Sequence, residues 1–289
     1  MWVVNAGSGR VLQSNGNSEA SIRKHFPADT LINTFNRDHL MHWAPDLPET
    51  GIAIIVGGDG AWREALQGAP EQVRPGLLPA GTLNQAAIDL KTTASVKAWR
   101  IWRYERIQLG HVHAPGHAGT NQNVFFLMAG VGVESDAVRL VRQGLKRRIG
   151  KWAYVWALFE RLIRPVRPTI VVGMDGRYFR TSQVLIQNAA HYGGHYRVAD
   201  TDVHRPDYRV LIWKYPGRFM WCLTMMCLMF GLPSGWLAHQ FPGGHVRIRS
   251  SGKKQCQLDG DTGPALPLCF TPTTAREIAI ADGERGGSK

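Results

Sequence analysis

The sequence predicts an α/β domain followed by a mainly antiparallel β domain. Its 289 residues amount to about two domains at the usual ~150 residues each. Over the first hundred residues the order strand, glycine-rich turn and helix repeats, which is typical of a parallel α/β sheet. After about residue 104, short strand-like runs alternate with turns, and two helical stretches interrupt them. We therefore expect the pattern to change near residue 104.

The elements of the first half follow from apolar runs and turn signals. Residues 52–56 form a continuous β-branched run, which is typical of a strand buried on both faces of a parallel sheet. Asn17 or Ser18 is a suitable cap for a helix over residues 17–25. The other expected elements are strands at 2–5, 31–34 and 76–79, a helix at about 61–67 and a helix ending near residue 90.

Strand-like runs dominate the second half. Asp175-Gly176 stands between two of them and predicts a two-residue hairpin turn. The two inserted helical stretches are expected at about 137–163 and 217–230. The expected strands are 104–113, 123–129, 169–174, 178–188, 208–214, 245–249 and 255–258.

The composition limits the class of protein. Apolar residues make up 44% of the chain, which excludes a disordered protein. The net charge of +12 indicates an anionic partner, such as a nucleic acid, a membrane surface or a phosphorylated ligand. The four cysteines have neither CxxC nor zinc spacing, so we expect a reducing cytoplasm. There is no signal-peptide pattern, and the longest apolar run, 219–232, is shorter than a membrane-spanning helix requires.

Three glycine-rich turns follow strands of the first half: Asn5 to Gly9, Gly57 to Gly60 and Gly81 to Asn84. Loops at the carboxyl ends of parallel strands share one edge of the sheet, where ligands bind. Glycines let phosphate oxygens approach the backbone, and helix N-termini favour anions. The carboxylate of Asp59 in such a loop is consistent with a divalent cation between it and the phosphates. The three turns together predict a phosphate-binding site.

Several common nucleotide-binding signatures are absent from the sequence. There is no GxxxxGK[ST] loop, so a P-loop enzyme is excluded. Gly7-Ser-Gly9 lacks the third glycine of a dinucleotide fingerprint. Neither HRD nor DFG occurs, so the protein-kinase signatures are missing as well.

The motifs around these turns resemble the catalytic domain of diacylglycerol kinases, a family that includes sphingosine kinases and bacterial soluble lipid kinases. The most specific are Gly57-Gly-Asp-Gly60 after a hydrophobic strand and Leu78-Pro-Ala-Gly-Thr-Leu-Asn84. Asn5 to Gly9 resembles the family's first nucleotide loop, and Asn188 to Gly194 resembles its Asn-x-x-x-x-Gly-Gly segment. Gln257 to Asp261 resembles its late Asp-Gly-Glu motif. The matches follow the family's order over nearly the whole chain.

The resemblance implies a two-domain fold with an active site in the cleft between the domains. An N-terminal α/β domain, similar to that of NAD kinases, would bind ATP with Mg²⁺. It would cover residues 1–104, with the tail 271–289 returning to it. A C-terminal β-sandwich domain with inserted helices, residues 105–270, would bind the lipid.

The resemblance also implies roles for individual residues. Asp59 would lie near the phosphates and reach the metal through the nucleotide. The late acidic turn would supply the general base that takes the proton from a lipid hydroxyl. Asp261 occupies the position of the family's Glu, but its side chain is one methylene shorter, so Asp259 remains an alternative. The expected nucleotide-binding residues are Asn5, Ser8, Gly9, Thr34, Gly57, Gly58, Asp59, Gly60, Glu64, Gly81, Thr82 and Asn84.

The sequence departs from the family pattern at three places. Ala61 replaces the Thr that usually follows GGDG, and Arg63 replaces the Asn before Glu64. Arg205-Pro206, followed by Asp207, stands where the family has an Asp-Gly turn linked to a structural Mg²⁺, so we do not expect that metal site here. The changes near the nucleotide loop leave open a protein that binds nucleotide with little or no turnover.

The most basic segment, Arg139 to Arg164, has apolar and Trp residues at helical spacing. Such a helix suits contact with an anionic membrane surface. Its apolar stripe could equally pack on the second domain, and both roles can hold. Phe219 to Leu232 could line a site for acyl chains or belong to the core. No nucleic-acid-binding module is recognised, so we do not expect a nucleic-acid partner.

The predicted function is transfer of the γ-phosphoryl group of ATP, with Mg²⁺, to a lipid hydroxyl. Diacylglycerol is the default acceptor, and sphingoid bases or other glycolipids remain open. The alternatives are a nucleotide- or lipid-binding regulator with an impaired kinase site, and a cytosolic NAD kinase, which shares GGDG. We expect a cytoplasmic protein with peripheral membrane contact, and a dimer is one of the oligomeric states left open.

Overall fold

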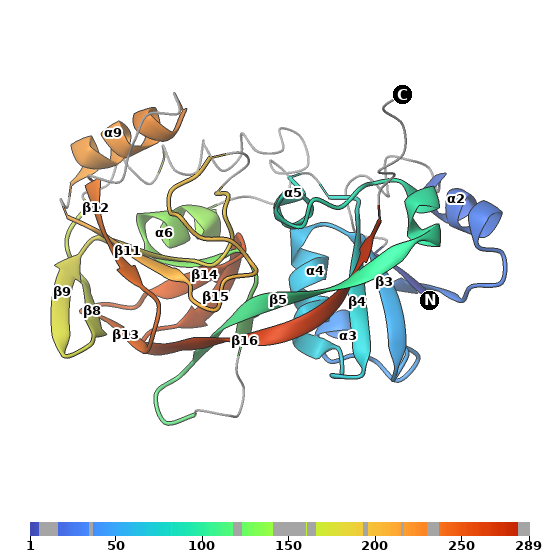
Figure 1. Ribbon diagram of the computed structural model, residues 1–289. Coiled ribbons are helices and arrows are strands. Elements are labelled where there is room, and N and C mark those ends of the chain that lie inside the picture. Colours follow the sequence, from blue (N-terminus) through green and yellow to red (C-terminus); the bar gives the residue numbers. More distant parts are fainter. Residues whose placement is uncertain are drawn as a thin grey trace. The chain divides into compact units, whose positions relative to one another are not determined.

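The computed structural model describes residues 1–5, 17–34, 37–81, 83–117, 123–140, 160, 166–192, 196–214, 217–229 and 237–282. The chain divides into two compact units (Figure 1). Unit 1 is Met1–Ile107 with Ala275–Lys289, and unit 2 is Gln108–Thr274. Strands β5 (Trp102–His113) and β16 (Leu268–Ala281) contribute residues to both units. Each unit has a hydrophobic core of its own.

Unit 1 is built on a parallel sheet with the strand order β2-β1-β3-β4-β16. The last of these strands joins through its C-terminal part, where Ala279 lies beside Gly76. Because the strands are parallel, the loops that follow β1, β3 and β4 leave from the same edge of the sheet. The first four strands are β1 (Trp2–Asn5), β2 (Leu31–Thr34), β3 (Gly51–Gly57) and β4 (Val73–Pro79).

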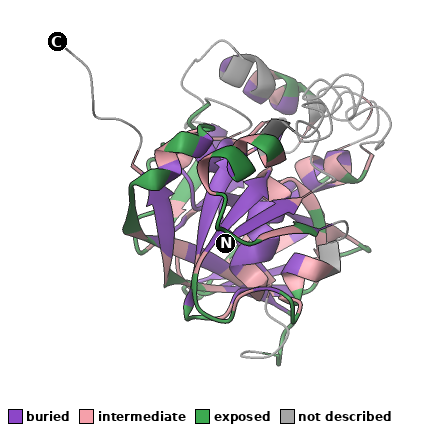
Figure 2. Ribbon diagram, turned by 90° about the vertical axis from the view of Figure 1, so that its right-hand side faces the viewer, coloured by how far each residue is buried: buried purple, intermediate pink, exposed green. Residues whose placement is uncertain are grey.

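Helices cover both faces of this sheet. Trp2 and Val4 of β1 pack in one cluster with Ile22 of α2, whereas Val3 packs in another with Leu40 of α3 and Ala65 of α4. This alternation places successive strand residues on opposite faces, and the strands are largely buried (Figure 2). The helices are α2 (Asn17–His25), α3 (Arg37–Met41), α4 (Asp59–Gly68), α5 (Gln85–Asp89) and a 3₁₀ turn at Val96–Arg100.

Unit 2 contains two antiparallel sheets. In the first, the N-terminal part of β16 pairs with β13, which pairs with β8 and then β9, and β5 pairs with β6. In the second the order is β12-β11-β10-β7-β14-β15. The bounds are β6 (Asn123–Phe125), β7 (Met128–Gly132), β8 (Ile170–Met174), β9 (Arg177–Thr181), β10 (Gln183–Gln187), β11 (Arg209–Trp213), β12 (Ala238–Pro242), β13 (Val246–Ser250), β14 (Gln255–Leu258) and β15 (Asp261–Ala265).

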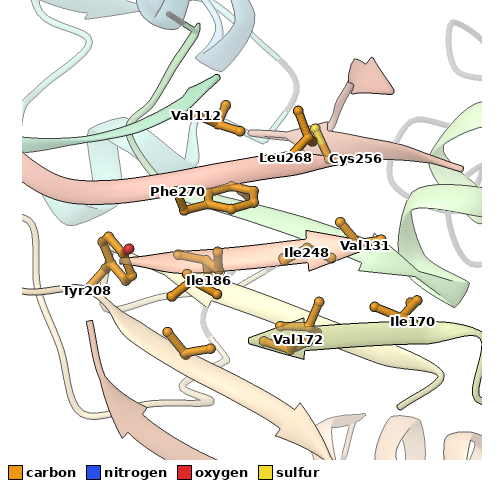
Figure 3. Packing of buried hydrophobic residues seen from close by; sticks show 14 of the residues in the cluster. Val112, Val131, Ile170, Val172, Ile186, Tyr208, Ile248, Cys256, Leu268 and Phe270 are labelled. Carbon is orange, nitrogen blue, oxygen red and sulfur yellow. The ribbon is translucent and has the colours of Figure 1, made fainter. Parts of the chain in front are cut away.

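The two sheets of unit 2 share one buried cluster (Figure 3). Val172 of β8 and Ile248 of β13 contribute from the first sheet, and Val131 of β7 and Ile186 of β10 from the second. The next residues along the second sheet's strands point away from this cluster. There α6 (Val133–Leu140) packs against β7, β14 and β15. This arrangement leaves a second, partly polar layer under α6.

Most of the expected elements are present, with different limits. The hairpin at Asp175-Gly176 is confirmed, because both residues have positive φ and Met174 pairs with Arg177. The expected strand 123–129 is two strands, and 178–188 is also two. The helix expected from 137 begins at Val133, and 141–159 and 161–165 lie outside the described residues. The helix expected at 217–230 is α9 (Arg218–Met229), while α3, β12, β15 and β16 were not predicted.

Candidate active site

The loops after β3 and β4 are joined through Asp59. Asp59 is the first residue of α4, and its Oδ1 accepts a hydrogen bond from the backbone N–H of Ala86 in α5 at 2.8 Å. Strands β3 and β4 pair in register up to Gly57 and Pro79, so their following loops begin side by side. The bond therefore fixes the starts of two helices next to each other at the carboxyl edge of the sheet.

Gly58 and Gly81 let these two loops approach closely. A Cβ added at Gly81 would lie 2.5 Å from the Gly58 Cα and 2.8 Å from the Asn84 Oδ1. Asn84 has a left-handed backbone (φ 50°) and closes the turn: its Oδ1 accepts from the Gly81 N–H at 2.7 Å, and its Nδ2 donates to the Gly81 oxygen at 3.0 Å. The close packing of these two loops therefore depends on glycine at both positions.

The other predicted nucleotide-binding residues of unit 1 have different environments. Thr34 is buried at the end of β2, and its hydroxyl donates to the Val4 oxygen at 3.4 Å. Asn5 ends β1, the strand between β2 and β3. Glu64 is buried in α4, as are Ala61 and Arg63, the two departures from the family pattern. Ser8, Gly9 and Thr82 lie outside the described residues.

In unit 2, Asp259 organises the bend between β6 and β7. Its Oδ2 accepts from the backbone N–H of Phe126 at 2.8 Å, and its Oδ1 accepts from Leu127 at 2.8 Å and Met128 at 2.9 Å. The Asp259 N–H donates in turn to the Met128 oxygen at 2.9 Å. These bonds explain why the run 123–129 is interrupted, since the amides at its centre point to a carboxylate instead of a neighbouring strand.

Asn188, from the segment that resembles the family's Asn-x-x-x-x-Gly-Gly, supports the same bend. Its Nδ2 donates to the oxygens of Gln108 at 2.9 Å and Phe126 at 2.8 Å. Two predicted motifs far apart in the sequence therefore meet at residues 126–128. Gly193, Gly194 and His195 of this segment lie outside the described residues.

Asp261 lies on the other side of the same turn. Asp259 and Gly260 both have positive φ, and Leu258 pairs with Asp261 across them, so Asp261 begins β15 directly after a two-residue turn. Asp261 is partly buried. The carboxylates of Asp259 and Asp261 thus differ in surroundings, because the first holds three backbone amides.

Sequence reasoning did not find Glu134, in the first turn of α6. Its carboxylate accepts hydrogen bonds from Gln183 Nε2 at 3.1 Å, Gln257 Nε2 at 3.2 Å and the side chain of Tyr192. Burial raises the pKa of Glu134 to about 7, and the bonds from Tyr192 and Gln183 oppose this shift. The signal in the sequence was an acidic residue directly after Gly130-Val-Gly132-Val, but the expected helix began three residues later than Glu134.

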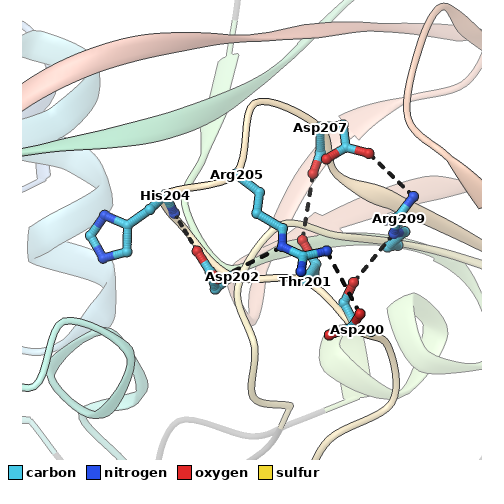
Figure 4. Close-up of polar contacts among 7 residues, drawn as sticks. All are labelled: Asp200, Thr201, Asp202, His204, Arg205, Asp207 and Arg209. Carbon is cyan, nitrogen blue, oxygen red and sulfur yellow. Dashed lines mark hydrogen bonds and ion pairs between the residues drawn. The ribbon is translucent and has the colours of Figure 1, made fainter.

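The loop at residues 200–209 contains Arg205-Pro206, which replaces the Asp-Gly turn of the family (Figure 4). Arg205 lies 3.7 Å from a carboxylate oxygen of Asp200 and 3.9 Å from one of Asp202. Arg209 lies 3.2 Å from Asp207. Arginine side chains thus face each of these acids. Among the described residues, no group of three or more His, Cys, Asp or Glu could hold a metal ion.

The two segments considered for lipid contact are only partly described. Of Arg139 to Arg164, the structure describes Arg139, Leu140 and Glu160. In α9, Trp221 is buried and stacks on Trp213 at 5.6 Å between ring centroids, while Phe219 is 77% exposed. The described helices include none long and apolar enough to cross a membrane.

The N-terminal part of the chain, which contains the glycine-rich loops, is similar to a known family. Residues 1–113 match the family model of the diacylglycerol kinase catalytic domain. The family resemblance is confirmed. The matched range includes β1, β3, β4 and the turns that Asp59 and Asn84 hold together.

Curated relatives in two staphylococci agree with this match. "Putative lipid kinase SERP0390" of Staphylococcus epidermidis is 25% identical over 151 residues, which are 50% of this chain and 48% of that protein. "Putative lipid kinase SAB0675c" of Staphylococcus aureus is 25% identical over 164 residues, or 55% of this chain and 52% of that protein. The matched region spans about half the length of these relatives. Neither a regulator nor an NAD kinase is favoured by them.

A solved structure extends the likeness over nearly the whole chain. The crystal structure of "a putative diacylglycerol kinase" from Bacillus anthracis superposes with a TM-score of 0.70 at 14% identity. The match covers 97% of this chain and 93% of that one. At this identity the likeness concerns the fold. The mixed α/β architecture described above is thus similar to that of diacylglycerol-kinase-like proteins.

Proposed function

We propose that this protein is a lipid kinase that transfers the γ-phosphoryl group of ATP to a lipid hydroxyl, with diacylglycerol as the first acceptor to test. The observation that carries the proposal is the bond from Ala86 to Asp59, which locks two glycine-bearing loops together at one sheet edge. These loops lie within the 113 residues that match the diacylglycerol kinase catalytic domain. Phosphoryl transfer depends on such positioning more than on covalent chemistry.

The residues of unit 1 fit a nucleotide with a divalent cation. Gly58 and Gly81 offer backbone to the phosphates, and the proposed nucleotide-binding residues are those named from the sequence. Mg²⁺ in kinases is usually held by one or two carboxylates together with substrate phosphates. Asp59 suits this role as a single carboxylate at the phosphate edge. The ion, when bound, would neutralise phosphate charge.

We assign the general base to Asp261, with Asp259 as the residue that shapes its surroundings. Both oxygens of Asp259 accept backbone hydrogen bonds. If the Asp259 carboxylate took up a proton, its O–H would compete with one of these amide N–H donors for the same oxygen. Asp261 begins the adjoining strand, directly after the turn, at the position of the family's Glu. It would accept the proton of the lipid hydroxyl as that oxygen attacks phosphorus.

The two units would then divide the work. We propose that unit 1 is the NAD-kinase-like nucleotide-binding domain and unit 2 the β-sandwich that binds the lipid, close to the predicted division at 1–104 with 271–289 and 105–270. Residues 139–164 would contact an anionic membrane surface, and α9 would contact the acyl chains of the lipid. The exposed Phe219 supports this for α9.

The test is ATP- and Mg²⁺-dependent phosphorylation of diacylglycerol in mixed micelles. Asp59→Asn and Asp261→Asn should each lower kcat at least a hundredfold, while Asp46→Asn, on an exposed loop of unit 1, should leave it unchanged. Asp261→Asn should keep ATP affinity, whereas Asp59→Asn should weaken it. Full activity of Asp59→Asn would refute the assigned site. Lack of phosphorylation over diacylglycerol, sphingoid bases and glycolipids would refute the lipid-kinase proposal.

The same assay separates the alternatives. A regulator with an impaired site would bind ATP without turnover, and Ala61→Thr should then restore activity. An NAD kinase would form NADP from NAD and ATP and ignore lipids. We expect neither result.

A further inference from the structure

The layer between α6 and the second sheet of unit 2 contains a polar network. Gln183, Gln187 and Gln257 are fully buried, although their strands supply apolar residues to the core on the other face. A buried amide is stabilised only when its polar atoms find partners. Around Glu134 they do so, because Gln183 and Gln257 both donate to its carboxylate.

The backbone leaves room for this carboxylate. A Cβ at Gly130 would lie 2.8 Å from Glu134 Oε2 and 3.1 Å from Gln257 Nε2. Gly130 lies on β7, directly beside Gln257 of β14. Any side chain at this position would displace either Glu134 or Gln257. The absence of a side chain at Gly130 therefore leaves the space that Glu134 and Gln257 occupy.

The network reaches the acidic turn through one side chain. Gln257 Nε2 donates to Glu134, and Gln257 Oε1 accepts from the backbone N–H of Gly260 at 2.8 Å. Gly260 is the residue between Asp259 and Asp261. The orientation of a single amide group thus connects the charge of Glu134 to the turn that precedes Asp261.

We propose that Glu134 is a positioning residue whose ionised carboxylate orients Gln257, and thereby holds the Asp259-Gly260-Asp261 turn in its active form. This inference rests on the proposed function for the role of Asp261, but the link from Glu134 to Gly260 does not. Three side-chain donors converge on the carboxylate, and an ionised carboxylate accepts all of them.

Protonation of Glu134 would change one of its carboxylate oxygens from a hydrogen-bond acceptor into a donor. A neutral Glu134 carries an O–H that needs an acceptor. When the proton is on Oε1, the oxygen that faces Gln257, Gln257 can accept it only by rotating its amide. The rotated amide would then present its NH₂ group to the Gly260 N–H, so two donors would face each other. The bond that holds Gly260 would be lost, while Glu134 and Gln257 would remain paired.

The elements packed around Glu134 carry further titratable and charged groups. Tyr192, after β10, donates to Glu134, and burial followed by the negative charge of Glu134 raises its pKa well above the usual value. Asp136 on α6 forms an ion pair at 3.1 Å with Lys254, the residue before β14. Asp259 and Asp261 flank the turn. Since the pKa of Glu134 is about 7, the network should change state near neutral pH.

The experiment measures hydrogen exchange of the Gly260 amide in the full chain, resolved by NMR or by fragmentation of the peptide 255–262, after correction for intrinsic exchange rates. In the native protein, protection should rise at least tenfold from pH 6 to pH 8. Glu134→Gln, which resembles the protonated acid, should show the low protection at both pH values. Asp136→Asn, a matched change on the same helix, should keep the native transition.

A second variant keeps the proposal testable if Glu134→Gln fails to fold. Tyr192→Phe removes one hydrogen bond to the ionised form, so the midpoint of the protection change should move to higher pH. Equal Gly260 protection in native protein and Glu134→Gln would overturn the proposal, as would an unmoved midpoint in Tyr192→Phe.

Activity provides a separate readout. With diacylglycerol, Glu134→Gln should lower kcat at least tenfold, leave KM for ATP unchanged and remove the rise in kcat near pH 7. If exchange responds as expected but no lipid is phosphorylated, the network holds and the proposed function fails. If exchange responds and kcat does not, the turn does not position the base, and the positioning role is refuted.

Discussion

Two aspartates, one in each unit, are each followed by a glycine, yet their carboxylates do different work. Asp59 accepts a backbone N–H from the start of α5 and so joins two loops at the carboxyl edge of the sheet of unit 1. Asp259 accepts three successive backbone amides and holds a bend between two strands. The first carboxylate arranges backbone around a proposed ligand, whereas the second arranges the protein itself. Similar motifs therefore need not supply similar chemistry.

The largest effect that this comparison predicts is on stability. Asp259→Ala should lower the free energy of unfolding of unit 2 by about 4 kcal/mol, because three backbone amides would lose a charged partner and such bonds are worth about 1.5–3 kcal/mol each without being additive. Asp175→Ala is the control, since Asp175 also precedes a glycine and also has a positive φ. Urea unfolding followed by hydrogen-exchange mass spectrometry would resolve unit 2. Equal losses in the two variants would show that backbone strain, and not the three bonds, decides the effect.

A third carboxylate, that of Glu134, makes the free energy of unfolding depend on pH. The pKa of Glu134 is about 7 in the folded state and lies near 4.5 ordinarily, so the folded state binds the extra proton between these values. Stability from this group is therefore full below pH 4.5 and falls as pH rises to 7, by about 3 kcal/mol. In Glu134→Gln this part of the pH dependence should vanish.

The measurement is the difference in free energy of unfolding between native protein and Glu134→Gln at several pH values from 4.5 to 8. The difference removes the contributions of other groups that titrate in this range. Asp136→Asn serves as the reference on the same helix. A difference that stays constant with pH would contradict the raised pKa.

In unit 1, the cationic side chain of Arg276, on β16, holds three backbone oxygens, as the anionic side chain of Asp259 holds three backbone amides. Its Nη2 donates to the backbone oxygens of Ala69, Pro70 and Val73, at 3.0, 2.6 and 3.0 Å, just after α4. Burial lowers the pKa of this guanidinium, so its hydrogen bonds must offset lost hydration. Arg276→Ala should destabilise unit 1 by about 2 kcal/mol. Thermal unfolding should show a much smaller change for Arg74→Ala, whose partner Glu277 has a side chain that is 42% exposed.

The sequence predicted strands β1 to β4 of unit 1, but not β16, because parallel α/β units have regular apolar runs and glycine positions. It was less informative in unit 2, where side chains far apart in sequence decide the local structure. The break between β6 and β7 depends on Asp259, more than a hundred residues later. The role of Glu134 depends on Gln183 and Gln257, whose burial no local pattern indicates. Asp259 could be identified as a candidate site residue from its motif, but the bonds that it makes to the bend between β6 and β7 could not be predicted.

The smallest expected change in stability comes from the close approach of the loops after β3 and β4, at the proposed nucleotide-binding edge. Gly81→Ala would place a Cβ 2.5 Å from the Gly58 Cα, so the loops must separate by several tenths of an ångström. The free energy of unfolding should fall by about 1–2 kcal/mol, at the low end for overpacking, because both loops lie at an edge of the sheet. ATP affinity should also fall, by at least tenfold, because the proposed phosphate contacts need the backbone geometry that the approach creates. Gly252→Ala, whose added Cβ would meet nothing within 4 Å, is the control for both measurements. Isothermal titration with ATP and Mg²⁺ would test the point, and an unchanged affinity in Gly81→Ala would place the phosphates away from this pair of loops.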